Sequence, residues 1–380
     1  MPRRATEIDV QRRRFLAQAG RAVLGFSAIG TAGNLFPASP AYAAPELPDV
    51  SSVPAALKGS GEVRVVCYGG TVQDAQRRAY FEPFERLTGI KVRDFPGADL
   101  NKLKAMVDTG TVEWDVVQLG RSSVRLLNKK GDYFEKIDYG NVDVDNIDPI
   151  HRYEHGCEML VFGQVMAYRT DGFNGAVPHG WADFWDVKKF PGDRTLGGAG
   201  PSTPELEFAL MAAGVEPGAL YPLDLDKAFA SYDKIKGAIV KWWETGAVPT
   251  QMLTDREVAL ATVWNGRMAA LEQAGVPAAV SWDQGLLKRD SWTVPKGAKN
   301  LGNAMKFIAF STMPVPQARL SMQVPYGFVN NKTAEIVPPR QLALLPTAPE
   351  LKSKLINYDY DWWADNREKV IERWSKWVLG

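Results

Sequence analysis

Short β-rich hydrophobic runs alternate with amphipathic stretches along the first part of the chain. The run Val63–Cys67 ends at Tyr68-Gly69-Gly70, and Thr71 is then placed to cap a helix. On this pattern we expect strands at 63–67, 90–92 and 114–119, and helices at 71–87 and 100–109. Strands that alternate with helices predict a parallel, layered α/β lobe.

A second series of the same kind begins after Asp171. Here the pattern predicts a short strand at 195–196, helices at 204–213 and 225–245, and a passage from helix to strand at 258–264. The long helix carries Trp242 and Trp243. Two such series predict two α/β lobes, and a central cleft between them is the place where ligands bind to open α/β sheets.

The expected boundaries follow from these two series. We assign residues 61–163 to lobe 1, with about 293–330 returning to it. We assign residues 164–292 to lobe 2, with about 331–380 packing as C-terminal helices. A leader rich in Pro, Ser and Ala occupies 44–60 and precedes the first lobe.

The N-terminal segment has the features of an export signal. Arg12-Arg13-Arg14-Phe15-Leu16 is a twin-arginine pattern, an apolar stretch covers 22–36, and Ala41-Tyr42-Ala43 is a cleavage signature. Glycines interrupt the apolar stretch, so it does not resemble a membrane-spanning helix. We expect a twin-arginine signal peptide at 1–43 that is removed on export to the periplasm; an uncleaved N-terminal anchor is the alternative.

Composition narrows the class of protein. Residues 1–43 hold six arginines and two acidic residues, so the remaining 337 residues carry 39 basic and 42 acidic side chains, a net charge of about −3. No concentrated basic patch is present, and we expect no nucleic-acid partner. An oxidising compartment permits a disulfide between Cys67 and Cys157, but two separately buried thiols fit their apolar surroundings equally well.

Sequence motifs for catalysis, metals and cofactors are missing. His151, His155 and Cys157 lie close together but match no structural zinc spacing, so we expect no metal. Neither G-x-S-x-G nor H-E-x-x-H occurs. The segment Gly197–Pro201 lacks the Lys-Ser/Thr ending of a phosphate-binding loop, although it precedes a helix whose free N–H groups can hold an anion. A plain loop before a helix is the alternative interpretation, and we expect no cofactor.

Aromatic residues are numerous, with 12 Trp, 12 Tyr and 16 Phe. Spacings typical of amphipathic helices place six tryptophans in the core, namely Trp242, Trp243, Trp362, Trp363, Trp374 and Trp377. Tyr68 and Trp264 differ because each lies beside a strand-ending turn that contains glycine. At such a rim an aromatic ring can stack on a ligand or cover a cationic group, and plain packing is the alternative.

From about Gly61 to its C-terminus the chain resembles the polyamine-type (spermidine/putrescine-like) periplasmic solute-binding proteins of ABC importers. The resemblance rests on the order of several short segments, which are Phe81–Glu85, Thr88–Val92, Trp114–Val117, Ala182–Asp186, Phe190–Gly192, Leu220–Asp224, Val263–Arg267, Pro295–Asn300 and Val324–Gly327. It implies a type II, hinged, two-lobed fold that closes on a small solute. It also implies delivery of that solute to a permease in the inner membrane by a monomeric protein.

The resemblance also implies site residues. Asp290 falls where the family places an amine-binding Asp, and Trp264 falls on a family aromatic. Glu205 or Glu207 falls near a second carboxylate. Such groups suit an amine, because an ammonium binds charged acceptors and aromatic faces. Tyr326, in the matching segment 324–327, completes this set.

Departures from the family pattern point to a different ligand. Lys288 replaces an aromatic residue, and Tyr68-Gly69-Gly70 replaces a Trp after the first strand. Arg121 follows Gly120 with Ser122 and Ser123 beside it, and its guanidinium can grip a carboxylate. We therefore expect either a polyamine or a zwitterion such as a γ-aminobutyrate-like or guanidino acid. In the alternative, Arg121 and Lys288 face solvent or pair with acidic residues.

Three functions fit these observations. The leading one is a solute-binding protein without catalysis, in which lobe closure sequesters the solute. The second is an exported enzyme on the same scaffold, since a fold does not fix a function. It lacks a nucleophile beside a base, because Cys67 and Cys157 both lie in apolar runs. The third is a binding protein that presents its ligand to a chemoreceptor.

Overall fold

A computed structural model of the protein describes residues 46–198 and 203–380. The expected signal peptide at 1–43 and part of the glycine-rich loop at 197–201 lie outside the described residues. Within the described part, no helix has the length and apolar character needed to cross a membrane.

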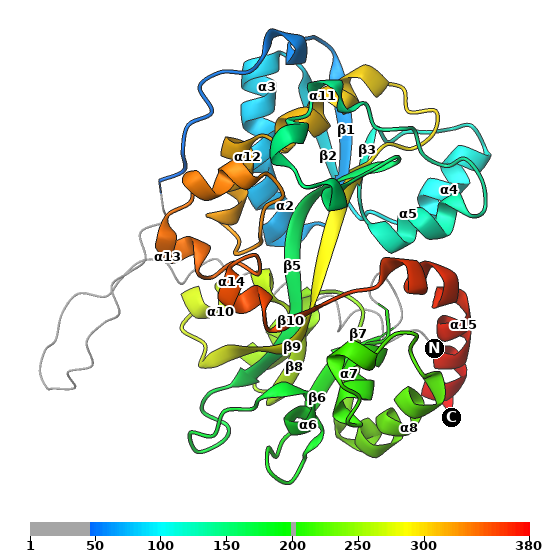
Figure 1. Cartoon of the computed structure of the whole chain (residues 1–380), viewed down its shortest axis with the longest axis vertical. Coiled ribbons are helices and arrows are strands. Elements are labelled where there is room, and N and C mark those ends of the chain that lie inside the picture. The colour runs from blue at the N-terminus through cyan, green and yellow to red at the C-terminus, as the bar shows by residue number, and fades with distance from the viewer. Residues whose placement is uncertain (1–45, 199–202) are drawn as a thin grey trace, which may run out of the picture. The chain divides into compact units, whose positions relative to one another are not determined.

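The strands form one mixed sheet that extends through two lobes (Figure 1). Its main order is β2-β1-β3-β9-β5-β8-β6-β7, with β10 beside β9 and β4 beside β5. The strands are β1 Glu62–Cys67, β2 Lys91–Pro96, β3 Val116–Gly120, β4 Arg152–Tyr153, β5 Gly156–Arg169, β6 Arg194–Gly197, β7 Ile239–Trp243, β8 Leu260–Trp264, β9 Ala278–Thr293 and β10 Leu355–Asn357.

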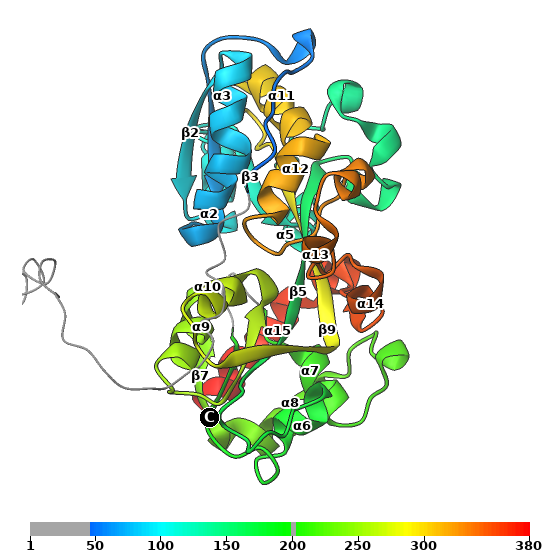
Figure 2. The same ribbon diagram turned by 90° about the vertical axis from the view of Figure 1, so that its left-hand side faces the viewer.

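Lobe 1 contains the parallel strands β2, β1 and β3, followed by antiparallel β9 and β5. The helices near these strands in Figure 1 are α2 Gly70–Gln76, α3 Glu82–Thr88, α4 Leu100–Asp108, α5 Arg121–Asn128, α11 Leu301–Ser311 and α12 Pro314–Ser321, and all but α4 are labelled near them again in Figure 2. A buried cluster that includes Phe84, Phe307 and Trp292 fills the core between the sheet and these helices. The alternation of strand and helix predicted for the first third of the chain is confirmed.

Lobe 2 repeats this plan with parallel β7, β6 and β8, followed by antiparallel β5 and β9. Its helices are α6 Gly180–Trp185, α7 Leu206–Ala212, α8 Leu225–Ile235, α9 Ala247–Thr254, α10 Met268–Gln273 and α15 Tyr360–Leu379. Of the two short helices before α15, α13 Pro339–Leu342 packs against α12 of lobe 1, and α14 Pro349–Lys352 precedes β10. Helix α15 inserts Trp363 and Trp374 into the aromatic core of lobe 2. The predicted two-lobed α/β fold is confirmed.

The two long strands β5 and β9 connect the lobes (Figures 1 and 2). Their antiparallel register is interrupted where Gln164 and Met166 of β5 face Leu286 and Ser281 of β9. Four residues of β9, 282–285, thus lie opposite the single residue Val165 of β5, and Gln284 among them adopts a positive φ of 62°. A bulge of this kind bends a strand, so this position can serve as the hinge between the lobes.

Helix α5 of lobe 1 also meets the C-terminal helix α15. Three basic side chains on or just after α5 pair with three acidic side chains of α15, namely Arg125 with Asp361, Lys129 with Asp365, and Lys130 with Glu368. Since α15 is anchored in the core of lobe 2, this row of ion pairs joins the two lobes away from β5 and β9.

Two local predictions were wrong. The long helix expected over 225–245 ends at Ile235, and residues 239–243 form strand β7, which pairs with β6. Gly237 and the β-branched pair Ile239-Val240 disfavour a helix there. Thr71 does not cap α2, because the helix begins one residue earlier, at Gly70.

Candidate functional site

A single cavity between the lobes collects most of the predicted site residues. It encloses about 930 Å³ of empty space, counting its opening to solvent. Its walls come from both lobes and from the C-terminal segment. The lining residues are Tyr68, Gly69, Val72, Gln73, Gln76, Gln118, Gly120, Ser122, Ser123, Leu160, Phe162, Thr203, Trp264, Arg267, Lys288, Arg289, Asp290, Tyr326, Tyr358, Tyr360 and Arg367.

Asp290 lies on β9 opposite Gly120 of β3, which places its carboxylate in the lobe 1 wall. A relay of amides orients it: Gln76 Nε2 donates to Gln118 Oε1 at 3.0 Å, and Gln118 Nε2 donates to Asp290 Oδ2 at 2.8 Å. Burial raises the pKa of Asp290 to about 6, against the lowering effects of Gln118 and Lys288. One oxygen of the Asp290 carboxylate is therefore held by a fixed donor. The carboxylate favours a cationic ligand group, because a nearby positive charge stabilises its ionised form.

Arg267 supplies a guanidinium from lobe 2, just after the end of β8. Its Nε is buried and has no hydrogen-bond partner. Across the cleft it approaches Gly70 so closely that a Cβ there would lie 3.1 Å from Arg267 Nη1. The positive φ of Gly70, 67°, is one that glycine adopts without strain. Gly70 thus contributes to the site by leaving room for Arg267, although it does not itself line the cavity.

Aromatic rings cover the Arg267 end of the cavity. Phe162 packs against Trp264 with ring centroids 6.1 Å apart and against Tyr326 at 5.8 Å. Asn265 fixes this corner, because it accepts from the backbone N–H of Gly163 at 2.8 Å and donates to the carbonyl of Pro325 at 2.6 Å. Burial raises the pKa of Tyr326 to about 12. Its hydroxyl stays protonated and can donate to a ligand.

A second part of the lining, called the Lys288 end below, consists of Tyr358 and the groups around it, which are Lys288, Thr203 and Arg367. The Lys288 ammonium lies over the Tyr358 ring, 4.3 Å from its centroid. Burial lowers the pKa of Lys288, while Glu207, Glu205 and Asp290 act in the opposite direction. This part of the lining therefore contains two cationic side chains, those of Lys288 and Arg367, and two hydroxyl groups.

Glu205 lies behind this wall and does not line the cavity. Its carboxylate accepts hydrogen bonds from Gln164 Nε2, from the backbone N–H of Gly197 at 2.8 Å and from Thr262 Oγ1 at 2.8 Å. Burial is the main reason that its pKa is raised to about 7. Glu207 is also buried and accepts from Tyr221 and Trp363, each at 2.6 Å.

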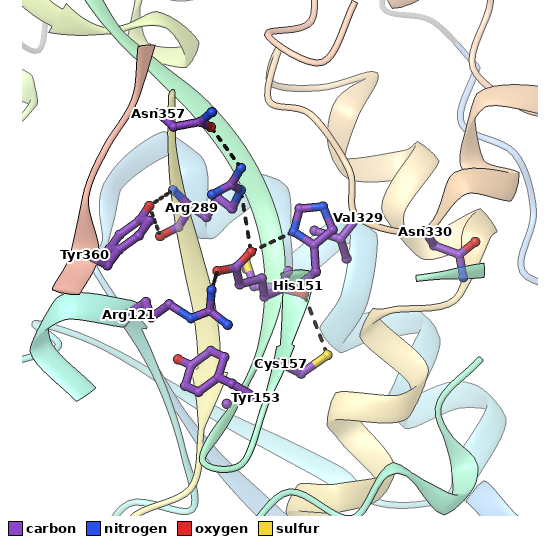
Figure 3. Close-up of polar contacts among 12 residues, drawn as sticks. Arg121, His151, Tyr153, Cys157, Arg289, Val329, Asn330, Asn357 and Tyr360 are labelled. Atoms are coloured by element: carbon purple, nitrogen blue, oxygen red, sulfur yellow. Dashed lines mark hydrogen bonds and ion pairs between the residues drawn. The ribbon is translucent and has the colours of Figure 1, made fainter. Parts of the chain in front are cut away.

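Arg121 does not line the cavity, and its guanidinium points toward a buried acid (Figure 3). Its Nη1 lies 3.6 Å from Glu158 Oε1, and its guanidinium stacks on Tyr153 at 4.4 Å from the ring centroid. His151 Nδ1 and Arg289 Nε also approach Glu158, at 2.7 and 3.7 Å. The structure thus shows the alternative considered for Arg121, a pairing with an acidic residue. Ser122, next in sequence, does line the cavity.

The thiols and imidazoles form no reactive or metal-binding cluster in the described part of the chain. Cys67 and Cys157 are free and buried, and burial raises the pKa of Cys157 to about 12. Within the described residues no group of three or more His, Cys, Asp or Glu side chains is placed to hold a metal ion.

Sequence reasoning missed the residues that meet only through the fold. Arg267 stood in the segment 263–267 but its guanidinium was not considered, although it follows a strand end beside Trp264, which is a signal for a cavity rim. Gln118 and Tyr358 gave no such signal, because an amide inside a strand and a tyrosine near the C-terminus are ordinary core residues. The arginine considered for a carboxylate was Arg121, at the start of helix α5, whose partner Glu158 lies on strand β5.

Comparisons with known proteins agree with this architecture. Residues 79–347 match the family of bacterial extracellular solute-binding proteins. The γ-aminobutyric acid-binding protein of Pseudomonas aeruginosa is 38% identical over 332 residues, which are 85% of this chain and 93% of that protein. The spermidine/putrescine-binding periplasmic protein of Escherichia coli is 24% identical over 292 residues, which are 72% of this chain and 80% of that protein.

Solved structures give the same result. A GABA receptor that is 38% identical superposes with a TM-score of 0.76, covering 83% of this chain and 97% of that one. An ABC transporter substrate-binding protein from Bradyrhizobium japonicum, 34% identical, superposes with a TM-score of 0.79, covering 84% and 99%. The family and its structural neighbours are solute-binding proteins, so the enzyme alternative has no support here. On its sequence and its two-lobed architecture, the chain belongs to the bacterial extracellular solute-binding proteins.

Proposed function

We propose that the protein is the periplasmic solute-binding component of an ABC importer and captures a γ-aminobutyrate-like ω-amino acid. The observation that carries this proposal is a carboxylate and a guanidinium in one cavity, Asp290 from the lobe 1 wall and Arg267 from lobe 2. Tyr326 lines the same cavity, and both groups affect the pKa of its hydroxyl.

The chemistry of these groups fits a zwitterion. Asp290 binds the ammonium, which gains further from the faces of neighbouring aromatic rings. Arg267 binds the carboxylate through two parallel hydrogen bonds. A linear diamine satisfies Asp290 but brings its second ammonium toward Arg267 or Lys288, and like charges repel strongly where water is scarce. The names of two relatives, the γ-aminobutyric acid-binding protein and the GABA receptor, support the same ligand class.

Capture on two lobes explains how binding is coupled to transport. A ligand held by Asp290 and Arg267 favours the closed arrangement, because only that arrangement satisfies both of its ends. In this proposal the closed form engages the permease in the inner membrane. Export through the twin-arginine route, with removal of residues 1–43, supplies the protein to the periplasm.

Isothermal titration of residues 44–380 tests the proposal. We expect γ-aminobutyrate and 5-aminovalerate to bind and putrescine and spermidine to bind far more weakly. Arg267→Gln should weaken γ-aminobutyrate binding by at least about 30-fold, since breaking a buried charge pair costs about 2 kcal/mol or more. Arg256→Gln, an exposed arginine of lobe 2, is the matched control and should change nothing. Tight binding of polyamines with no binding of ω-amino acids would refute the proposal.

A further inference from the structure

We propose that the Lys288 end of the cavity is a second anion subsite, so that the preferred ligands are amino dicarboxylates rather than simple ω-amino acids. This inference rests on the proposed function, in which Asp290 holds the amine and Arg267 holds a distal carboxylate. It concerns a second carboxylate that is attached close to the amine.

The strand geometry places Lys288 beside the amine position. Lys288 and Asp290 are two residues apart on β9, so their side chains project from the same face of the strand about 7 Å apart. Both line the cavity. A carboxylate one or two bonds from an amine held by Asp290 lies within reach of the long, flexible Lys288 side chain.

The Lys288 ammonium has no acidic partner in the described part of the protein, and a ligand carboxylate can supply one. Within residues 46–198 and 203–380, no acceptor lies within hydrogen-bond or ion-pair distance of it, and the ammonium lies over the Tyr358 ring. The nearby acids Glu205 and Glu207 each accept hydrogen bonds from other groups. They attract the ammonium from a distance without pairing with it. A partly buried cation gains much from a charged acceptor, so this end of the cavity is selective for an anion.

The surrounding groups are donors as well. Thr203 Oγ1 and the Tyr358 hydroxyl lie 3.4 Å apart, and both residues line the same end of the cavity, together with Arg367. Hydroxyl groups and a guanidinium can complete the hydrogen bonds of a carboxylate held by Lys288. Among the described residues that line the cavity, Asp290 is the one carboxylate.

The charges of the cavity lead to the same ligand class. The charged residues in the described lining are Asp290, Arg267, Lys288, Arg367 and Arg289, and the Arg289 side chain is set against Glu158. Cations therefore outnumber the single carboxylate. A zwitterion satisfies Asp290 and Arg267 and leaves the charge of Lys288 uncompensated. An amino dicarboxylate has one ammonium and two carboxylates, so it matches Asp290, Arg267 and Lys288.

Titration calorimetry with four probes tests the subsite: γ-aminobutyrate, L-glutamate, N-(carboxymethyl)-4-aminobutyrate and putrescine. We expect at least one dicarboxylate to bind at least about 10-fold more tightly than γ-aminobutyrate. In Lys288→Met, which removes the charge and keeps an unbranched side chain of nearly the same length, dicarboxylate binding should weaken at least about 30-fold and γ-aminobutyrate binding less than about 3-fold. Lys288→Arg keeps the charge and should retain the preference.

The possible failures are distinguishable. If γ-aminobutyrate binds to the wild type and both dicarboxylates bind more weakly, the subsite is refuted while the proposed function stands. A second result would also refute the subsite. If Lys288→Met loses equal affinity for the dicarboxylate and for γ-aminobutyrate while its melting temperature is unchanged, Lys288 only holds Tyr358 in place. If neither ligand class binds, the proposed function fails and the subsite with it. Should Lys288→Met not fold, the wild-type preference and Lys288→Arg decide the matter.

Discussion

Replacing Asp290 by asparagine removes one charge from the cavity wall and changes little else. The asparagine side chain has nearly the same shape and can still accept the hydrogen bond from Gln118. In the ligand-free protein, burial raises the pKa of Asp290 from its usual 3.8 to about 6. A pKa that is higher in the folded state means that ionisation at neutral pH weakens the fold.

The size of this effect follows from the two pKa values. A difference of about two units corresponds to roughly 3 kcal/mol, and the partial contact of the side chain with water in the cavity reduces it to about 1–3 kcal/mol. Asp290→Asn should therefore raise the free energy of unfolding of the ligand-free protein by that amount at pH 8. The stability gain should fall to roughly half at pH 5, because the wild-type carboxyl is then largely protonated in the folded state and the linkage is incomplete.

The same substitution should impair binding. Without the carboxylate, the ligand ammonium is left with a neutral acceptor in a partly buried site, and we expect γ-aminobutyrate binding to weaken at least about 30-fold. Urea denaturation at pH 8 and pH 5 measures the stability, and titration calorimetry measures the affinity. Asp255→Asn, which changes an exposed aspartate, is the matched control. A variant less stable than wild type at pH 8, or one that binds with unchanged affinity, would contradict this reasoning.

Two further predictions concern the support of the site. Gly70→Ala should weaken ligand binding, because the new Cβ would displace Arg267. The control is Gly97→Ala, which is also at positive φ but has no atom within 4 Å, and it should cost only about 1 kcal/mol of stability. Calorimetry and urea denaturation on both variants separate the loss of binding from the loss of stability. Glu158→Gln should lower the free energy of unfolding by about 3–5 kcal/mol, because Arg121 and Arg289 lose their shared counter-charge. The control Glu154→Gln changes an exposed residue and should alter the free energy of unfolding by less than about 1 kcal/mol. Equal urea midpoints for the two variants would argue against a stabilising role of Glu158.

The lobes were predictable from the sequence because their evidence is local. Strand–helix alternation and glycine-containing turns recur at fixed short spacings, and they placed Tyr68 and Trp264 at strand ends. Both residues line the cavity in the structure. Asp290 and Tyr326 came from the family resemblance, and they line the same cavity. Their roles in ligand binding remain predictions until the variants are measured.

Predictions failed where the deciding interaction is distant in sequence. The segment 239–243 has aromatic spacing that also suits a helix, and only its pairing with β6, more than forty residues earlier, makes it a strand. Arg121 is another example, because its partner Glu158 lies 37 positions away on β5. Nothing near Arg121 in the sequence distinguishes a guanidinium that faces a ligand from one that faces a buried acid.

The cavity holds its charges apart in the ligand-free protein, and this separation explains why ligand charge should govern closure. Asp290 in the lobe 1 wall and Arg267 in lobe 2 are each partly desolvated, and neither has a counter-charge within ion-pair distance among the described residues. Desolvation of such groups opposes closure of the lobes around them. A ligand with an ammonium and a carboxylate offsets this desolvation cost at both Asp290 and Arg267. A solute with only one of these groups offsets the cost at one residue alone and should leave the lobes less fully closed.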